Sequence, residues 1–450
     1  RICGPISARC EGARARRGVG DEQLALLLYA DDIVVLANNA EDLQKMMKAV
    51  ESFCRRWRLQ VNMGKTKVIE FGTRGVGKVQ VYWKGERLEK VEEYKYLGML
   101  VEKGGAWKKT KEGMMRKARR AATLAWSMAV RGGDMSVKGM TNIWNALIRP
   151  HLEYGAEVLN TNNDFVWEEA EKLARKIGRR VLKCGRSLPN DAIMGELGWM
   201  TMRGRRMLLR LSYWGKVLQM EDSRWVKKAY EHGRARLDRN ARAHTWCNLT
   251  HKWLVELKLE EEWVQQAVGP GWAELLKAKI LEHEARNWKM RIVKNAKLED
   301  YAKWKTKPGL EPYLKHENVH QRRLWTKLRG GCLELRVETG RRERVLVGGK
   351  HVPKPRYLRR CKLCYDELED SHHVLFRCRA YKHERAAMAV KVEAQALPKV
   401  VMAMRGVQRD DGGRTDEMVV IRWLMCDGGE VAGMEMLEDV MRKRKKLLGE

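Results

Sequence analysis

Residues 24–37 read LALLLYADDIVVLA, an apolar run that only Asp31 and Asp32 interrupt. A continuous apolar run predicts strands that are buried on both faces, with a turn between them. Burying a carboxylate costs several kcal/mol unless it is paired, and two adjacent carboxylates repel unless a cation lies between them. Because Mg²⁺ binds carboxylates together with phosphates, the run predicts a hairpin whose acids hold a divalent metal. The competing interpretation is an Asp-Asp turn that merely faces solvent.

The segment after this hairpin predicts a helix. Asn39 is a suitable N-cap, and Asp42 follows at the third helical position, so we expect a helix that ends at about Trp57. Its apolar residues recur at helical spacing, which predicts one buried face. These residues are Leu43, Met46, Met47, Val50 and Phe53.

Short strands and then a long helical region are predicted downstream. Lys84-Gly85 separates two short strands and predicts a second hairpin, and residues 94–101 predict a single further strand. From 106 to about 330 we expect helices almost throughout. We interpret the tryptophans of this region as packing anchors between helices, with base stacking as the alternative: Trp199, Trp214, Trp225, Trp246, Trp253, Trp263, Trp272, Trp288 and Trp304.

The charge balance predicts a polyanionic partner. The chain has 90 Lys and Arg residues against 58 Asp and Glu, a formal net charge of +32. Such a surplus repels itself in the compact state but favours nucleic acid, because Lys and Arg release counterions from phosphates. The alternative is a merely basic surface, as on a ribosome-associated or membrane-surface protein. No apolar run approaches the roughly 20 residues of a membrane span, and there is no signal peptide. We therefore expect an intracellular protein without a membrane segment.

A cysteine and histidine cluster near residue 370 predicts a zinc site. Its pattern is Cys361-x2-Cys364-x8-His373-x4-Cys378. The first gap lets two thiolates of one turn reach a tetrahedral ion, and the last suits residues that share a helix face. We expect His372 to face solvent, but it could replace His373, with spacings of seven and five residues; ordinary core thiols are the other alternative. Basic neighbours suggest contact with RNA or DNA: Arg356, Arg359, Arg360 and Lys362.

Residues 26–72 resemble the reverse transcriptases of non-LTR (LINE-type) retrotransposons. The hairpin Tyr29-Ala30-Asp31-Asp32, a helix and an Asn-x-x-Lys-Thr motif come in this order at the family's spacing. The resemblance implies an RNA-directed DNA polymerase that extends the 3′ hydroxyl of a nicked target by two-metal nucleotidyl transfer. It also implies Mg²⁺ and Zn²⁺ as cofactors; RNA template, target DNA and dNTPs as partners; and action in the nucleus.

The same resemblance implies roles for individual residues. Asp31 and Asp32 would be catalytic and hold Mg²⁺, with Asp31 as a direct ligand and Asp32 supporting the site, and Tyr29 would contact the substrate or nucleic acid. Lys65 would offset pyrophosphate charge or donate a proton; a solvated turn lysine is the alternative. Asn62 and Thr66, of the same motif, would approach the incoming nucleotide.

Residues downstream of 72 extend the resemblance. Tyr96-Leu97-Gly98 resembles the segment that supports the primer end, and LIRPHLEYGAEVL (147–159) is similar to the segment after the thumb in these elements. The zinc cluster is similar to the family's zinc motif. The basic helix at 106–131 looks like the thumb, which grips phosphates, with the contacts assigned to Lys108, Lys109, Arg116, Arg119 and Arg120.

The expected fold class is α+β: a truncated palm with an antiparallel sheet, then a mostly α-helical thumb and extension with a small zinc knuckle. The expected domains are an irregular segment (1–20), a partial palm (21–104), a thumb (105–150), a helical extension (151–345), the knuckle (346–385) and a mixed tail with a basic C-terminus (386–450). Residues 341–360, punctuated by Pro and Gly, look like a linker.

The resemblance further predicts that fingers, the first part of the palm with another catalytic carboxylate, and an endonuclease lie upstream of residue 1. We therefore expect this chain by itself to lack polymerase activity. The rival interpretation is a decayed or domesticated nucleic-acid-binding protein without catalysis.

Overall fold

The computed structural model describes residues 18–19, 22–23, 25–71, 80–105, 107–131, 135–159, 165–239, 245–395, 420, 423–425 and 428–449. Two compact units are formed. Unit 1 comprises Arg1–Lys117, Glu153–Val166 and Arg206–Leu276, and unit 2 comprises Ala118–Leu152, Trp167–Arg205 and Lys277–Glu450. The irregular segment expected at 1–20 lies almost wholly outside the described residues, as does much of the tail expected at 386–450.

The strands of unit 1 form small sheets rather than one antiparallel sheet. In the described ranges every sheet is two-stranded, and the β5–β8 pair is parallel. Most paired strands are neighbours in the sequence and are joined by short turns, so they form hairpins. The strands are β1 (Gly18–Val19), β2 (Glu22–Gln23), β3 (Leu26–Tyr29), β4 (Asp32–Val35), β5 (Lys67–Val68), β6 (Tyr82–Trp83), β7 (Glu86–Arg87), β8 (Glu89–Lys90), β9 (Glu93–Tyr96) and β10 (Met99–Glu102).

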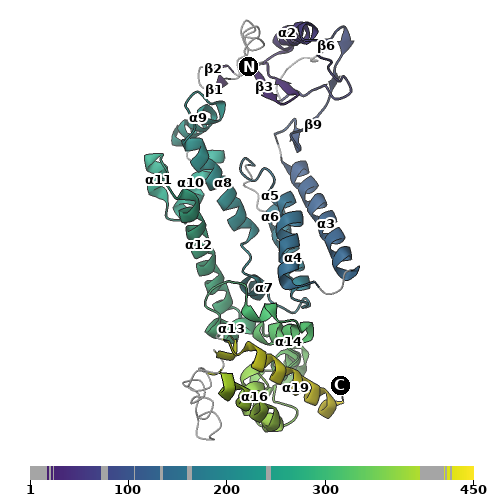
Figure 1. The fold of residues 1–450 in the computed structure, drawn as a ribbon, viewed down its shortest axis with the longest axis vertical. Helices are drawn as coiled ribbons and strands as arrows, with labels where there is room; N and C mark the ends of the chain where they lie inside the picture. Colours follow the sequence, from purple (N-terminus) through teal and green to yellow (C-terminus); the bar gives the residue numbers. More distant parts are fainter. Residues whose placement is uncertain are drawn as a thin grey trace. The chain divides into compact units, whose positions relative to one another are not determined.

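Helix α2 (Ala40–Arg56) confirms the predicted cap and buried face. Asn39 accepts a hydrogen bond from the backbone N–H of Asp42 at 2.8 Å, and its amide donates to the Asp42 carboxylate at 2.9 Å. Figure 1 shows α2 beside β6 in the N-terminal part of the chain. The shared core consists of Met46, Met47, Val50, Phe53, Cys54, Val68, Val81, Trp83 and Leu88.

Two-residue turns with positive φ shape the later hairpins. Lys84 (φ 48°) and Gly85 (φ 83°) join β6 to β7, as predicted. Leu97 (φ 46°) and Gly98 (φ 79°) join β9 to β10, so the single strand expected at 94–101 is wrong. Turns of this type suit the twist of paired strands, and Gly98 provides the flexibility that makes the reversal possible.

Helices dominate the rest of the chain, as expected. Helices α3 (Lys108–Arg131), α8 (Met202–Leu218) and α12 (Trp272–Lys294) contribute residues to both units. Unit 1 also contains α9 (Trp225–Arg239), α10 (Trp246–Glu256) and α11 (Glu260–Gln265). The tryptophans fit the packing interpretation: Trp214, Trp253, Trp272, Trp288 and Trp304 are buried, and the other four are half-buried. Within the described residues, no helix combines the length and apolar character that crossing a bilayer requires.

Among its described residues, unit 2 contains one hairpin and a set of helices, and the longest helix that lies wholly within it has 19 residues. Its elements are α4 (Val137–Ile143), the π-helix η1 (Trp144–Ile148), α5 (Arg149–Glu153), α6 (Phe165–Val181), α7 (Asn190–Leu197), η2 (Ala296–Leu298), α13 (Glu299–Trp304), η3 (Pro312–Lys315), α14 (Val319–Arg329), α15 (Arg336–Thr339), η4 (Gly340–Arg342), β11 (Arg344–Val347), β12 (Lys350–Pro353), η5 (Arg356–Leu358), the π-helix η6 (His373–Arg377), η7 (Arg379–Tyr381), α16 (Lys382–Gln395) and α19 (Glu430–Leu448). The β11–β12 hairpin shows that the linker expected at 341–360 is wrong.

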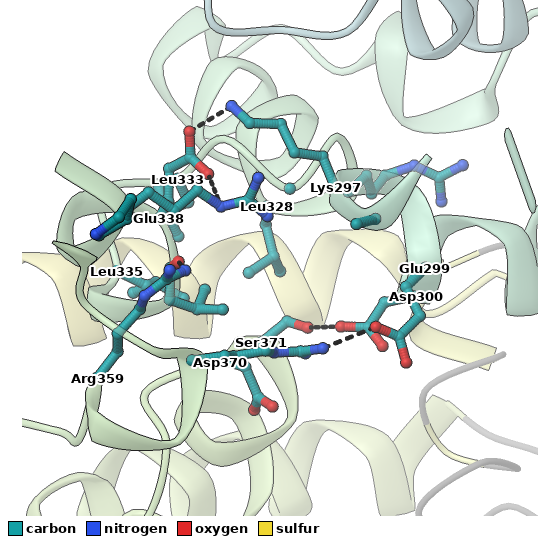
Figure 2. A pocket seen from close by; sticks show the side chains of 17 residues that line it. Lys297, Glu299, Asp300, Leu328, Leu333, Leu335, Glu338, Arg359, Asp370 and Ser371 are labelled. Carbon is teal, nitrogen blue, oxygen red and sulfur yellow. Dashed lines mark hydrogen bonds and ion pairs between the residues drawn. The ribbon is translucent and has the colours of Figure 1, made fainter. Parts of the chain in front are cut away.

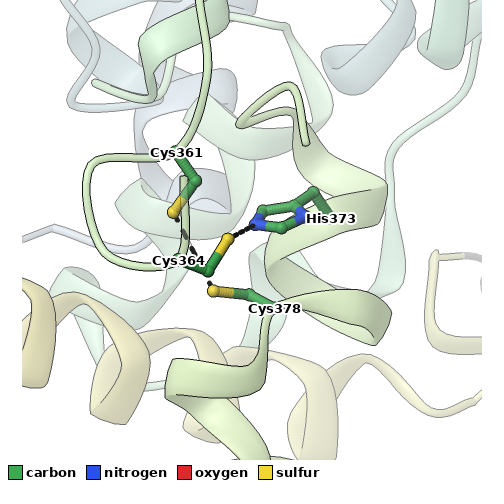
Figure 3. A group of neighbouring side chains, drawn as sticks. All are labelled: Cys361, Cys364, His373 and Cys378. Carbon is green, nitrogen blue, oxygen red and sulfur yellow. Dashed lines mark hydrogen bonds between the residues drawn. The ribbon is translucent and has the colours of Figure 1, made fainter. Parts of the chain in front are cut away.

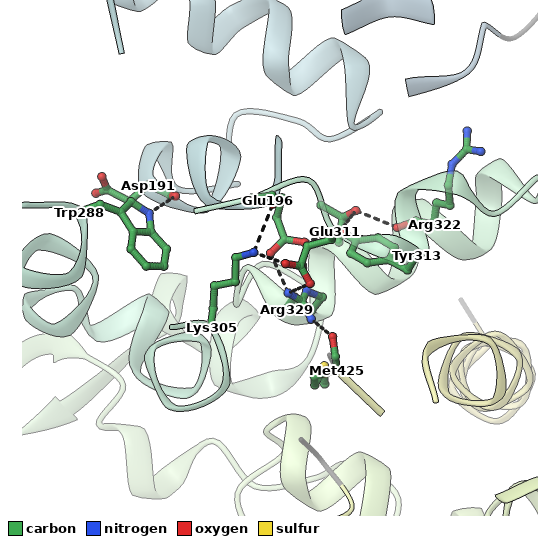
Figure 4. A network of polar contacts seen from close by, with 11 residues as sticks. Asp191, Glu196, Trp288, Lys305, Glu311, Tyr313, Arg322, Arg329 and Met425 are labelled. Atoms are coloured by element: carbon green, nitrogen blue, oxygen red, sulfur yellow. Dashed lines mark hydrogen bonds and ion pairs between the residues drawn. The ribbon is translucent and has the colours of Figure 1, made fainter. Parts of the chain in front are cut away.

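A buried arginine joins several segments of unit 2 (Figure 4). Arg329 of α14 is fully buried. Its guanidinium donates to both carboxylate oxygens of Glu196 on α7, each at 3.0 Å, and to Glu311 at 2.7 Å. It also donates to the carbonyl of Met425. Because a buried charge is tolerated only when it is paired, these contacts fix α7 and α14 together.

Two acids cap the N-terminal end of α8 within unit 2. Glu171 of α6 accepts hydrogen bonds from the backbone N–H groups of Met202 and Arg203. Glu284 of α12 accepts from the backbone N–H and the hydroxyl of Thr201. Negative charge is favoured at a helix N-terminus, but burial raises the pKa of Glu284 to about 7, because it outweighs the hydrogen bonds from Thr201.

This carboxyl makes stability depend on pH. The folded chain holds the Glu284 proton up to about pH 7, whereas the ordinary pKa is 4.5, so the free energy of unfolding should fall as pH rises between these values. Glu284→Gln keeps an acceptor for Thr201 without the charge. We expect it to raise the free energy of unfolding at pH 8 relative to the wild type, and to raise it less at pH 5.

Urea denaturation between pH 4.5 and 8 measures this effect. The matched control is Glu282→Gln on the same helix, because the Glu282 side chain is 65% exposed and should leave the pH slope unchanged. An identical slope in the wild type and Glu284→Gln would contradict the prediction.

Candidate active site and metal centre

The paired acids lie at the tip of the β3–β4 hairpin, as predicted. Tyr29 pairs with Asp32 across the hairpin, so Ala30 and Asp31 form the two-residue turn. Ala30 has φ 51°, a conformation that costs a residue with a Cβ some energy. The turn places Asp31 at the apex and Asp32 at the start of β4. Metal binding by these acids stays a prediction.

The strands of this hairpin are more exposed than expected. Leu27 and Leu28 are each 37% exposed and Tyr29 is 63% exposed, so the expectation of burial on both faces is wrong. The reason is local: the first strand pair, Leu26 with Val35, packs against the α2 core, while the half near the turn extends beyond it. The two acids are therefore exposed to solvent. Because their charges are not buried, burial alone gives no reason to expect a metal ion between them.

Tyr96, the last residue of β9, lies within electrostatic range of Asp32. Burial and, secondly, the charge of Asp32 raise the pKa of the Tyr96 hydroxyl. The Tyr-Leu-Gly motif begins at this residue. A role in supporting a primer end stays a prediction.

Tyr154 is a positioning residue that the sequence pattern did not reveal. Its hydroxyl donates a hydrogen bond to the carbonyl of Leu97 at 2.5 Å. A Cβ on Gly98 would lie only 3.2 Å from the same hydroxyl oxygen, so a glycine there permits the contact. Tyr154 belongs to the segment 147–159, which resembles the family, and its hydrogen bond gives that segment a structural role beside the Tyr-Leu-Gly turn.

The Asn-x-x-Lys-Thr motif forms a hydrogen-bonded turn. The side-chain oxygen of Asn62 accepts from the backbone N–H of Lys65 at 3.1 Å, and the hydroxyl of Thr66 donates to the carbonyl of Asn62 at 2.9 Å. Tyr94, to which the sequence assigned no role, donates to the carbonyl of Lys65 at 2.8 Å. Asn62 and Thr66 thus shape the turn, and the Lys65 side chain is exposed. Contacts of these residues with a nucleotide stay predictions.

The cations assigned to the basic helix all lie on its exposed surface: Lys108, Lys109, Arg116, Arg119 and Arg120. Two of them already have acidic partners, because Lys109 pairs with Glu93 and Arg119 pairs with Glu169 at 3.1 Å. Exposed pairs of this kind are weak, so they can exchange for phosphates.

The four predicted zinc ligands converge in unit 2 (Figure 3). Cys361, Cys364, His373 and Cys378 are all buried, and their ligand atoms lie within 4.8 Å of one another. The sulfurs of Cys361 and Cys378 are 3.9 Å apart, and the sulfur of Cys364 is 3.3 Å from Nε2 of His373. A tetrahedral zinc ion with bonds of about 2.3 Å to sulfur needs such separations. The donor set therefore fits zinc.

Polar contacts around the ligands suit a metal centre. Nδ1 of His373 lies 3.5 Å from the Glu367 carboxylate, an arrangement that orients a metal-binding imidazole. The alternative ligand, His372, does not belong to the converging group. Its ring lies 6.4 Å from that of Trp304 and is half-buried, so the expectation that it faces solvent is wrong.

The zinc loop (residues 361–378) is tied to the C-terminal helix. Glu369, which is fully buried, accepts from Nε and Nη2 of Arg444 on α19 at 3.1 and 3.2 Å and from the backbone N–H of Arg336 at 2.7 Å. Arg444 is itself buried, so the basic run at 442–446 is not wholly a solvated tail. The loop therefore depends on more than its own residues for packing.

A pocket of about 410 Å³ lies next to the zinc loop within unit 2 (Figure 2). Charged groups pair across it: Arg356 with Glu299 at 2.7 Å, and Lys297 with Glu338. Ser371 donates to Asp300 at 2.9 Å. The Ser371 contact joins the zinc loop to α13, and the Arg356 contact joins η5 to the same helix. We assign the pocket a packing role.

Comparison with known proteins identifies the N-terminal region. Residues 2–101 match the family model described as reverse transcriptase (RNA-dependent DNA polymerase). This match includes the acidic hairpin, the Asn62–Thr66 turn and the Tyr-Leu-Gly turn. The chain therefore carries a reverse transcriptase domain.

Two relatives connect the chain to mobile elements. A transposon-derived protein of Caenorhabditis elegans, itself uncharacterized, is 29% identical over 154 residues, which are 32% of this chain and 52% of that protein. The RNA-directed DNA polymerase from the mobile element jockey of Drosophila funebris is 24% identical over 160 residues, which are 34% of this chain and 17% of the polymerase. The chain thus matches about half of one relative and about a sixth of the other, and it is distantly homologous to a non-LTR element's reverse transcriptase.

The metal centre yields a test of ligand identity. We expect His373→Ala to lose bound zinc and to lower the melting temperature, because its Nε2 faces Cys364. His372→Ala, the adjacent control, should keep one zinc per chain. Zinc content by elemental analysis and thermal melting measure both effects. Loss of zinc in His372→Ala but not in His373→Ala would move the ligand by one residue, and absence of zinc from the wild type would identify ordinary core thiols.

Proposed function

We propose that this chain serves RNA-templated DNA synthesis by a non-LTR retrotransposon, with the β3–β4 hairpin as part of the polymerase site. The observation that carries this proposal is that Asp31, in the hairpin turn, and Asp32, the first residue of β4, are adjacent and exposed within a matched reverse transcriptase domain. Target-primed synthesis, the thumb and the palm are the corresponding finer assignments, and they rest on the resemblance together with the relatives' names.

The hairpin residues suit nucleotidyl transfer. Asp31 and Asp32 would hold Mg²⁺, which when bound neutralises charge on the attacking and leaving oxygens. Both acids are exposed, so a primer end and a nucleotide could reach them. The effect of the Asp32 charge on Tyr96 supports a role of the Tyr-Leu-Gly turn in holding a primer end.

Lys65 is suited to the leaving group. Its backbone is fixed by Asn62 and Tyr94, while its ammonium extends from an exposed side chain. An ammonium held on a rigid turn can pair with a pyrophosphate oxygen or donate a proton to it. We propose this role for Lys65 and a positioning role for Asn62 and Thr66.

Nucleic acid is the partner that the remaining surfaces favour. The net charge of +32 and the exposed cations of α3 support phosphate contacts. The zinc centre supports contact with RNA or DNA through the basic residues beside it. These contacts would hold template, primer and target strands while the hairpin acts.

The second candidate is nucleic-acid binding without catalysis. The exposure of Asp31 and Asp32 favours it, because solvated acids need no metal ion for the fold. Primer extension on an RNA template separates the two roles. Incorporation of dNTPs that disappears in Asp31→Asn would identify a polymerase in this chain. Binding to nucleic acid without incorporation would favour the non-catalytic role.

Metal binding at the hairpin can be tested without measuring synthesis. Fe²⁺ replaces Mg²⁺ at carboxylate sites and, with ascorbate and peroxide, cleaves the nearby backbone. We expect cleavage close to residue 31 that excess Mg²⁺ suppresses. Asp31→Asn should abolish this cleavage, whereas Glu86→Gln, an exposed acid beside the β6–β7 turn, should keep it. Cleavage that is unchanged in Asp31→Asn, or absent from the wild type, would refute the metal assignment.

The cations of α3 give a prediction about salt dependence. Six or more phosphate contacts would weaken binding by roughly 10³-fold between 50 and 200 mM salt. Arg116→Ala with Arg120→Ala should reduce the slope of log affinity against log salt by about 0.9 for each phosphate that is no longer neutralised. Fluorescence anisotropy with an RNA–DNA hybrid measures the slope. The control pair Lys277→Ala with Lys307→Ala removes equal charge from other exposed positions, and an equal reduction in both pairs would indicate a general charge effect instead.

A further inference from the structure

The segment 341–360 contains a hairpin that the proposed function does not use. Strands β11 and β12 pair in antiparallel register from Arg344 with Pro353 to Val347 with Lys350. Gly348 (φ 54°) and Gly349 (φ 76°) make the turn. Glycine adopts both conformations at little cost, so the sequence that looked like a linker specifies a tight hairpin.

The base of this hairpin is firmly anchored. The Glu343 carboxylate accepts from the Arg336 guanidinium and from Nζ of Lys354 at 3.0 Å, and the backbone N–H of Lys354 donates to the carbonyl of Glu343 at 2.8 Å. Arg359 donates twice to the carbonyl of Lys354, at 3.0 and 2.7 Å. Since its base is held by ion pairs and backbone bonds, the hairpin can act as one body, which we call the arm (residues 344–353).

The arm is cationic and apolar, and it contains no acid. Arg344, Lys350 and His351 are exposed, and residues 344–353 include neither Asp nor Glu. At the end of the arm, Leu346 is 65% exposed and Val347 is 54% exposed. Soluble proteins usually protect strand edges with charges or by covering them. An arm with cations along its sides and bare aliphatic groups at its end is suited to a polyanion with an apolar interior.

We propose that the turn end of the arm inserts into the major groove of duplex DNA, with Arg344 and Lys350 on phosphates and with Leu346 and Val347, which lie on opposite faces of the ribbon, against base edges on its two sides. This inference rests on the proposed nucleic-acid function. The B-form major groove, about 12 Å wide, admits a two-stranded ribbon, whereas the major groove of A-form RNA is too narrow for side chains to read. The geometry therefore favours DNA over double-stranded RNA.

Binding of the full chain to matched DNA and RNA duplexes tests the proposal. Arg344→Ala with Lys350→Ala should weaken DNA binding by roughly tenfold at 150 mM salt and lower the salt slope by up to about 1.8. Leu346→Ala with Val347→Ala should weaken DNA binding by about fivefold without changing the salt slope, because the phosphates stay neutralised. Both variant pairs should leave binding to double-stranded RNA within about twofold of the wild type.

Matched controls separate the arm from general effects. Lys277→Ala with Lys307→Ala removes the same charge, and Met290→Ala with Val293→Ala removes aliphatic groups that are 52% and 64% exposed; neither pair should weaken DNA binding as much. Zinc content and melting temperature confirm that each variant folds. A photo-crosslinker at position 346 should form an adduct with DNA, and one at position 293 should not.

The outcomes distinguish the two hypotheses. If the wild-type chain binds no nucleic acid, the proposed function fails, and the arm proposal fails with it. If the chain binds DNA while the arm variants and the crosslinker behave like the controls, only the arm proposal is overturned. Equal weakening of DNA and RNA duplex binding would also overturn it, because the arm would then act outside the major groove.

Discussion

Arg329 is the cation around which unit 2 is built. It has almost no exposure to solvent, so its charge requires partners from the segments that surround it. Glu196, Glu311 and the carbonyl of Met425 supply them. Breaking a buried ion pair by removing one partner costs about 3–5 kcal/mol. The residues that carry these partners are therefore restricted to one arrangement, although they are far apart in the sequence.

Helix α19 connects the helix that carries Arg329 to the zinc loop. This helix packs against α14, which carries Arg329, and its Arg444 pairs with Glu369 of the zinc loop. The loop contains all four candidate zinc ligands. A metal ion would therefore bind to a loop that is already held in part by the buried Arg444–Glu369 ion pair. An ion pair between Glu343 and Lys354 likewise holds the base of the arm.

The acidic hairpin of unit 1 is organised on a different principle. The end of the hairpin far from the turn packs on the α2 core. Near the turn, Asp31 and Asp32 are exposed to solvent, and Ala30 has a positive φ. The charge of Asp32 is felt at Tyr96, and Tyr154 supports the turn after Tyr96. Ala30 shares its positive φ with Lys84 and Leu97 in the other hairpins, so the backbone of this turn is that of an ordinary hairpin. What distinguishes it is the pair of adjacent exposed carboxylates.

The sequence by itself determined the local features of this protein. The predictable features were the cap at Asn39, the buried face of α2, the hairpin at Lys84-Gly85, the acids at the tip of β3–β4 and the convergence of Cys361, Cys364, His373 and Cys378. They were predictable because neighbouring residues dictate turns, caps and ligand spacing. It did not predict the exposure of Leu27 and Leu28, since an apolar run cannot tell which end of a hairpin meets the core. Nor did it predict the Tyr154 bond to Leu97, the Arg444–Glu369 pair, or the hairpin at 344–353. Most of these depend on which distant segments meet, and only tertiary packing decides whether a charge is buried beside a partner or left in water.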